Sequence, residues 1–240
     1  ILTDRDIDRD HAAIPSLLAV SAVHHYLISV GKRVQTALIV ESGEIREVMH
    51  AALLLGYGAS ALCPYMVYAI LDDLVKRKKI QENYATAEAN YIKAVKKGLL
   101  KIMAKMGIST IRSYRGAQIF EAVGLSEGLL RTYFGTETSS IGGIGLDTIA
   151  RDAVRFHDEA KKELEKGVDK PLPNLGQFHW RQDGIKHAWN PETISMLQLA
   201  TRLGSYKKFK EYSHAIDEKA EPIFLRDFLT FKPGKSIPLE

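Results

Sequence analysis

The chain has 240 residues, of which 45% are hydrophobic and 26% are charged, and its net charge is +4. This length allows one large domain or two small ones with a sizeable core, and the composition is that of an ordinary globular protein. A charge of +4 is small for 240 residues, so it does not by itself indicate a nucleic-acid partner. The one cysteine, Cys63, excludes an internal disulfide and an all-cysteine metal site within the chain, which indicates a reducing compartment.

The first thirty residues predict neither a signal peptide nor a membrane span. Residues 1–10 are charged where a signal peptide requires an apolar core. Residues 12–30 contain no Asp, Glu, Lys or Arg, but Pro15, His24 and His25 favour a buried helix over a membrane span. Both ends of the sequence look interrupted. Residues 1–3 resemble the end of a strand, and the last five residues, SIPLE, contain no recognisable cap. We therefore expect a fragment of a longer, cytoplasmic protein.

The first eighty residues alternate between short apolar runs and longer amphipathic segments. The runs predict strands at residues 1–3, 36–40 and 59–62, and the segments predict helices at residues 15–30, 44–56 and 64–79. This alternation predicts an α/β fold with right-handed βαβ units on a parallel sheet, similar to half of a β/α barrel. The carboxyl ends of such strands carry ligands and chemistry, and here they carry Asp4, Arg5, Glu41 and Ser42.

Residues 91–125 predict a helix, a short strand and a second helix. Apolar residues recur at three- and four-residue steps up to Met106, and Gly107 is suited to end that helix. Residues 108–114 alternate well enough for a strand, and a shorter helix is expected from Arg115 to Gly124. This arrangement places three polar side chains around the end of the strand, namely Arg112, Arg115 and Gln118.

The remainder of the chain is predicted to be mainly helical. Helices are expected at residues 126–133, 146–165 and 224–229, and two more are expected after Asn190, with a break near Gly204. Asn190 is suited to cap one of them, with Pro191 at its first position. Residues 178–181 and 185–189 flank a Gln-Asp-Gly sequence, which predicts a β-hairpin. The shift in pattern predicts a domain boundary, with residues 1–85 forming the end of an α/β domain and residues 86–240 a helix-rich connector.

Several motifs could carry chemistry, and each has a simpler interpretation. His24 and His25 point about 100° apart on a helix, so a core histidine is favoured over a shared metal site. The apolar surroundings of Cys63 favour a small buried residue over a nucleophile. A pair of histidines in the predicted hairpin, His179 and His187, lacks the acids or thiolates that would complete a metal site. A glycine-rich loop at residues 142–145 lacks the preceding strand and the lysine of a nucleotide loop, so it is interpreted as a turn.

Four lysines recur every fourth residue on the helix that begins near residue 91, namely Lys93, Lys97, Lys101 and Lys105. We call this row the lysine stripe. A stand-alone basic module that binds nucleic acid or an acidic protein is one interpretation of it. No stacking aromatic side chains accompany the lysines, so a solvated face, or one docked on an acidic domain, is favoured.

Two long motifs resemble a known family. YIKAVKKGLLKIMAKMGIST at residues 91–110 and SYRGAQIFEAVGL at residues 113–125 resemble the large chain of glutamate synthase, where its central domain meets its FMN-binding domain. SIGGIGLDTIA at residues 140–150 and HAWNPETI at residues 187–194 follow in the order expected of that family. The resemblance covers almost the whole chain.

The resemblance implies an enzyme that makes glutamate from 2-oxoglutarate and glutamine-derived ammonia by flavin-dependent reduction. It implies FMN and an iron–sulfur cluster for the full-length enzyme, with electrons from a small NAD(P)H-oxidising subunit or from ferredoxin. Other domains of the same large chain are the implied partners, in a bacterial or archaeal cytosol or in a plastid. No catalytic, cofactor-binding or metal-binding residue of the family matches a position here, so the fragment alone is expected to be inactive.

The resemblance and the polar residues together predict a structural segment. We expect it to position the amidotransferase and synthase sites and to help enclose the route that ammonia takes between them. The candidate domain-seam or channel residues are Asp4, Arg5, Glu41, Ser42, Arg112, Arg115 and Gln118. A structural network of ion pairs at a domain seam explains the same residues as well as a ligand site does.

Overall fold

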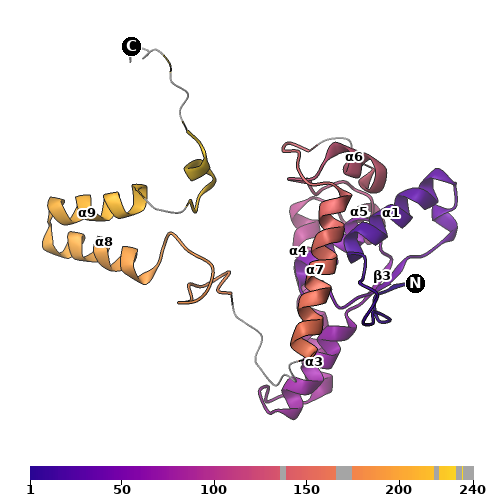
Figure 1. The fold of residues 1–240 in the computed structure, drawn as a ribbon. Helices are drawn as coiled ribbons and strands as arrows, with labels where there is room; N and C mark the ends of the chain where they lie inside the picture. Colours follow the sequence, from indigo (N-terminus) through magenta and orange to yellow (C-terminus); the bar gives the residue numbers. More distant parts are fainter. Residues whose placement is uncertain (136–138, 166–174, 219–221, 231–233, 235–240) are drawn as a thin grey trace. The chain divides into compact units, whose positions relative to one another are not determined.

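The computed structural model describes residues 1–135, 139–165, 175–218, 222–230 and 234. The chain divides into two compact units, Ile1–Val168 and Asp169–Glu240, and each is described separately below (Figure 1). Within the described residues no helix is long and apolar enough to cross a membrane. The division of the chain at residues 85 and 86 into two domains stays a prediction.

The first unit contains a three-stranded parallel sheet, as the sequence predicts. Its strands are β1 (Leu2–Thr3), β2 (Ile39–Glu41) and β3 (Ala61–Cys63), in the order β1-β2-β3. Leu2 pairs with Val40, and Val40 pairs with Leu62. The strands are parallel, so the residues that follow them meet at one edge of the sheet and the residues that precede them meet at the other.

Helices follow each of these strands, and a capping box marks where one of them begins. They are α1 (Ser16–Ser29), the 3-10 helix η1 (Arg33–Gln35), α2 (Val48–Gly56) and α3 (Tyr65–Lys76). The sequence predicted that α2 begins at Glu44, but a capping box of Glu47 and His50 begins it at Val48. Glu44 instead accepts a hydrogen bond of 2.7 Å from the backbone N of Ser16, at the start of α1.

The long helix α4 (Tyr84–Lys105) carries the lysine stripe and packs on α2 and α3. Asn83 caps it by accepting a 2.9 Å hydrogen bond from the backbone N of Thr86. Gly98 faces α2 so closely that a Cβ atom there would lie 2.5 Å from a methyl carbon of Val48. Glycine at this position therefore allows α4 to approach α2.

The predicted strand at residues 108–114 and helix at residues 115–124 are both wrong. Residues 111–114 form a short helix, α5 (Ile111–Tyr114), because the Thr110 hydroxyl caps it by accepting from the backbone N of Ser113. Gly116 and Gln118 have φ angles of 74° and 50°, which a right-handed helix does not permit. The backbone N of Gly116 instead donates a 2.7 Å hydrogen bond to the carbonyl of Gly56, so this segment turns back onto α2.

Two apolar clusters hold the first unit together. The larger one joins the sheet to the helices and includes Val20, Val40, Ile45, Leu54, Met103 and Tyr114. Tyr114 is fully buried, and its hydroxyl donates a 3.1 Å hydrogen bond to the carbonyl of Ala52, which fastens α5 to α2. The smaller one gathers Leu18, Leu129, Leu130 and Phe134 from α1, α6 (Glu127–Leu129) and the π-helix η2 (Leu130–Phe134).

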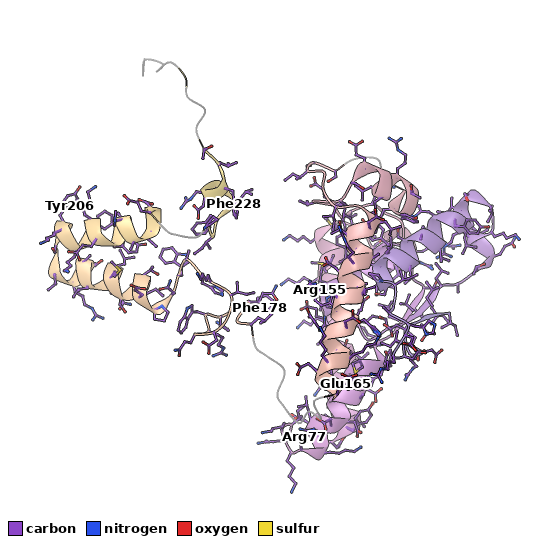
Figure 2. All side chains as sticks on the ribbon, viewed as in Figure 1. Arg77, Arg155, Glu165, Phe178, Tyr206 and Phe228 are labelled. Atoms are coloured by element: carbon purple, nitrogen blue, oxygen red, sulfur yellow. The ribbon has the colours of Figure 1, made fainter. Side chains whose placement is uncertain are left out.

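The helix α7 (Leu146–Glu165) is confirmed and completes the first unit. Its side chains include Arg155 and Glu165 (Figure 2), and Glu165 pairs with Nη2 of Arg9 at 2.6 Å. Before α7, residues 124–126 and 141–144 form short backbone hydrogen bonds, including Ile144 N to Gly124 O at 2.9 Å. The glycine-rich loop is thus held against the backbone of residues 124–126.

The second unit is a helical pair followed by a short turn of helix. Its elements are α8 (Pro191–Leu203), α9 (Tyr206–Asp217) and the 3-10 helix η3 (Leu225–Phe228). Asn190 caps α8 as predicted, and Gly204 ends it with a φ angle of 58°. The predicted β-hairpin is wrong in its strands. The turn forms, with Gly184 N bonded to Arg181 O at 3.1 Å, but Ile185 N bonds to Leu175 O, and no strand is assigned at residues 178–189.

Candidate functional site

The carboxyl edge of the sheet gathers four of the seven predicted residues. Asp4 and Arg5 follow β1, and Glu41 ends β2 with Ser42 after it. Because β1 and β2 are adjacent and parallel, both pairs meet at this edge. We call this group, with Thr3 and Tyr65, the carboxyl-edge network.

An ion pair forms the outer half of the network. Nε of Arg5 lies 2.5 Å from Oε1 of Glu41, and the Thr3 hydroxyl donates a 2.9 Å hydrogen bond to Oε2 of Glu41. The guanidinium of Arg5 also lies over the ring of Tyr65, 4.2 Å from its centre. Both oxygens of Glu41 are therefore occupied by neighbours within the sheet edge.

The inner half of the network is a turn held by Asp4. The buried hydroxyl of Ser42 donates a 2.6 Å hydrogen bond to Oδ2 of Asp4, and it accepts one of 3.1 Å from the backbone N of Glu44. Oδ1 and Oδ2 of Asp4 accept from the backbone N of Gly43 at 3.2 and 3.1 Å. The backbone N of Asp4 donates to the carbonyl of Glu41. The two strand ends are thus linked in both directions.

The electrostatics of this edge favour fixed charges. Hydrogen bonds from Arg5 and then Thr3 lower the pKa of Glu41, and the bond to Glu41 raises the pKa of Arg5. Burial, followed by the neighbouring Asp4 carboxylate, raises the pKa of Tyr65 to about 12. At neutral pH these shifts keep Glu41 as an anion, Arg5 as a cation and Tyr65 as a protonated phenol, and none of these three groups is poised to exchange a proton.

A hollow of about 350 Å³ opens beside the network. Its lining includes Asp4, Glu41 and Ser42 from the strand ends, together with Ile7 and Ala13 from the segment between β1 and α1. It is large enough for a small molecule or for a side chain of a neighbouring domain. The network thus lines a hollow as well as linking two strands.

The other three predicted residues lie elsewhere, and the structure does not bring them to the carboxyl edge. Nη1 of Arg115 donates a 3.0 Å hydrogen bond to the hydroxyl of Ser60, which directly precedes β3, so Arg115 lies at the amino edge. Nε2 of Gln118 lies 3.4 Å from the carbonyl of Gly135. Arg112 is exposed and has no ion-pair or hydrogen-bond partner in the part of the chain that the structure describes.

Sequence reasoning missed Arg33, which also lies at the amino edge. Its Nε donates a 2.8 Å hydrogen bond to Nδ1 of His24, which is buried as a core histidine was expected to be. Burial, and then the positive charges of neighbours led by Arg33, lower the pKa of His24 to about 4. Arg33 lies three residues before the strand predicted at residues 36–40, and this position could have indicated that its side chain lies at the amino edge.

The structure also places the histidines and the cysteine that the sequence offered as candidates for chemistry. Within the described residues no group of three His, Cys, Asp or Glu could hold a metal ion. Nε2 of His187 contacts the carbonyl of Gly176 at 2.6 Å. Cys63 is half-buried rather than fully buried as expected, and its Sγ atom lies 4.0 Å from Oε1 of Glu41.

Comparison with known proteins identifies the family. The model of the glutamate synthase central domain matches residues 1–126, which include the sheet and both of its edges. The chain belongs to the glutamate synthase family. Its match to the glutamate synthase [NADPH] large chain of Bacillus subtilis (strain 168) is 45% identical over 245 residues and covers all of this chain.

Other glutamate synthases match the same length of chain. The glutamate synthase [NADH] of Schizosaccharomyces pombe is 36% identical over 244 residues and covers all of this chain. The ferredoxin-dependent, chloroplastic glutamate synthase of Spinacia oleracea is 37% identical over 248 residues and covers 98% of it. The chain spans 16%, 12% and 15% of the lengths of these three relatives. It corresponds to a segment of each of these glutamate synthases, and residues 1–126 of it match the central-domain model.

Proposed function

We propose that this chain is a structural segment of a glutamate synthase, which fixes the geometry between the site that releases ammonia and the site that uses it. The observation that supports the proposal is the carboxyl-edge network. Its carboxylates, hydroxyls and guanidinium bind one another, and they join the ends of two strands beside a hollow. A network of this kind holds a surface in one shape, as the boundary of a route for ammonia requires.

The chemistry of the chain supports a positioning role over a catalytic one. An iron–sulfur cluster requires several thiolate ligands, and one cysteine does not supply them. Glu41, whose pKa is lowered, is held by Arg5 and Thr3, so it is not available as a general base. We propose that FMN and the iron–sulfur cluster belong to other parts of the full-length enzyme, and that the ammonia-releasing nucleophile does too.

The proposed reaction of the full-length enzyme is reductive synthesis of glutamate from 2-oxoglutarate and glutamine-derived ammonia. The relatives are named for NADPH, NADH or ferredoxin as electron donor, so the family supports a small NAD(P)H-oxidising subunit or ferredoxin as partner. We propose a cytosolic enzyme, or a plastid enzyme where ferredoxin is the donor. The alternative of a stand-alone nucleic-acid-binding module gains no support from these relatives.

The experiment measures coupling in the full-length enzyme that carries this segment. The rate of glutamine hydrolysis is compared with the rate of 2-oxoglutarate consumption in wild type, Glu41→Ala and Arg115→Ala. We expect the wild-type ratio to be one and the ratio in the variants to exceed one, because ammonia escapes before it reacts. Arg115→Ala also tests the prediction that the amino edge belongs to the same domain seam.

A matched control separates this effect from loss of a surface ion pair. Asp72→Ala removes a carboxylate that pairs with Nζ of Lys76 at 2.5 Å on α3, outside the network. We expect its ratio to stay at one. If Glu41→Ala folds normally and also keeps a ratio of one, the network has a packing role only and the proposal is wrong.

A further inference from the structure

The amino edge of the sheet holds two arginines and a histidine, of which the proposed function uses only Arg115. Arg33 lies in η1, His24 lies in α1, and Arg115 directly follows α5. Arg33 and Arg115 are half-buried, and His24 is 8% exposed. We call these three residues, with Ser60, the amino-edge cluster.

Three contacts fix the guanidinium of Arg33. Its Nε donates to Nδ1 of His24 at 2.8 Å, Nη1 to the carbonyl of Thr36 at 2.5 Å, and Nη2 to the carbonyl of Gly58 at 2.6 Å. All three acceptors are neutral, so none of them balances the charge. A guanidinium has five N–H groups, so Arg33 keeps further donors while its plane is held in place.

Arg115 is held beside it through Ser60. Nη1 of Arg115 donates to the Ser60 hydroxyl at 3.0 Å, and the same oxygen accepts from the backbone N of Leu38 at 3.2 Å. Burial, and then the charge of Arg115, lower the pKa of Arg33, so the two cations act on each other. The fold therefore places two guanidinium groups together at one end of two strands.

His24 contributes a donor and no charge. Arg33 Nε can only donate, so Nδ1 of His24 must accept and the ring proton must lie on Nε2. A pKa of about 4 keeps this ring neutral at physiological pH. A Cβ atom on Gly116 would lie 3.8 Å from Nε2, so the absence of a side chain at Gly116 leaves room beside that donor.

No carboxylate balances these charges within the described residues, where neither Arg33 nor Arg115 forms an ion pair. Half-buried cations that repel each other destabilise a fold unless an anion compensates them. Guanidinium groups bind carboxylates and phosphates through paired N–H donors. We propose that the amino-edge cluster binds an oxyanion of the carboxylate or phosphate class, between Arg33 and Arg115.

The oxyanion has two possible sources, a free anion or a carboxylate side chain from another part of the full-length protein. Arginine modification by phenylglyoxal, mapped by mass spectrometry, measures each arginine separately. In the 240-residue chain, inorganic phosphate or acetate is added at constant ionic strength. A free anion is expected to slow modification of Arg33 and Arg115 saturably, by roughly fivefold at four times its Kd, while exposed Arg112 is unaffected. Arg33→Gln is expected to abolish the protection of Arg115.

The full-length protein tests the second source. A carboxylate from another domain is expected to protect Arg33 and Arg115 without added anion. Arg115→Gln then leaves that carboxylate unpaired and lowers the Tm, while Arg115→Lys keeps a cation there and restores more than half of the loss. The proposal is overturned if no anion dependence is seen in the 240-residue chain and lysine rescues no better than glutamine in the full-length protein.

Discussion

The two edges of the same small sheet differ in the charges that they bring together. At the carboxyl edge, Arg5 and Glu41 have opposite charges and bind each other at 2.5 Å. At the amino edge, Arg33 and Arg115 have the same charge, and each donates to a neutral side chain, Arg33 to His24 and Arg115 to Ser60. At the carboxyl edge, Arg5 and Glu41 pair within the described residues. At the amino edge, the guanidinium of Arg33 keeps N–H donors beyond its three hydrogen bonds. This difference is the basis of both proposals, namely that the carboxyl edge maintains geometry and that the amino edge binds an oxyanion.

The largest expected effect lies at the amino edge, where Gly58 packs on His24. Gly58 has a φ angle of 117°, and a Cβ atom there would lie 2.3 Å from Nδ1 of His24. We expect Gly58→Ala to lower the free energy of unfolding by about 4 kcal/mol, because it adds backbone strain to a steric clash. Gly31→Ala is the control, since Gly31 also has a positive φ but faces open space, and about 1 kcal/mol is expected. Equal losses in urea unfolding would show that the ring of His24 does not occupy this place.

Acid is expected to weaken the amino edge before the carboxyl edge. The pKa of His24 is lowered from 6.5 to about 4. Between these two pH values, His24 is protonated in the unfolded chain and neutral in the folded chain. Stability is therefore full above pH 6.5 and falls as the pH drops towards 4, by about 3 kcal/mol in total. Unfolding free energies at pH 7, 5.5 and 4 should show this fall in the wild type and not in His24→Gln. The same slope in both proteins would contradict the buried neutral histidine.

A moderate effect is expected for Ser42 at the carboxyl edge. Its hydroxyl is 1% exposed and bridges Asp4 and the backbone of Glu44. Ser42→Ala should lower the free energy of unfolding by about 2 kcal/mol, because buried partners lose their hydrogen bonds. Ser29→Ala removes an exposed hydroxyl that bonds to the carbonyl of Tyr26, and less than about 0.5 kcal/mol is expected. A loss at Ser42 no larger than at Ser29 would mean that the turn does not depend on the bridge.

The smallest effect is expected for Glu41, which is partly open to solvent. Arg5 and Thr3 lower its pKa, so its contribution to stability is present above the unfolded value of 4.5 and is lost as the pH falls below it. Glu41→Gln should remove this contribution, and the difference from wild type should shrink at high salt. Urea midpoints at pH 7 and pH 3, at two salt concentrations, measure it. A difference that persists unchanged at pH 3 would show that the charge of Glu41 is not what holds Arg5.

Local patterns in the sequence predicted the sheet and half of the site. The apolar β-branched residues before Glu41 indicated a strand, and parallel topology then required Asp4 and Glu41 to meet. The cap at Asn190 was also predicted, because its signal lies within four consecutive residues. The family resemblance, carried by motifs across residues 91–194, is confirmed by the match to the glutamate synthase central domain at residues 1–126 and by relatives aligned over the whole chain.

The missed contacts of the two arginines join separate elements, whereas the missed helix α5 depends on a local cap. Residues 108–114 alternate like a strand, but no neighbouring strand pairs with them, and Thr110 caps a helix instead. The partner of Arg115 is Ser60, 55 residues earlier, and that of Arg33 is His24 on another helix. A periodic pattern reports which face of an element is buried, and it does not report which polar group that face meets.

The most direct test of the central claim exchanges the two charges of the carboxyl edge in the full-length enzyme. If Arg5 and Glu41 only hold two strand ends together, Arg5→Glu and Glu41→Arg should each release ammonia without glutamate formation, because each brings like charges together. The double variant restores an ion pair with the charges reversed. We predict that it brings the ratio of glutamine hydrolysed to 2-oxoglutarate consumed back towards one. A double variant as uncoupled as the single ones would contradict this account and assign Glu41 or Arg5 a direct contact with the migrating ammonia or another ligand.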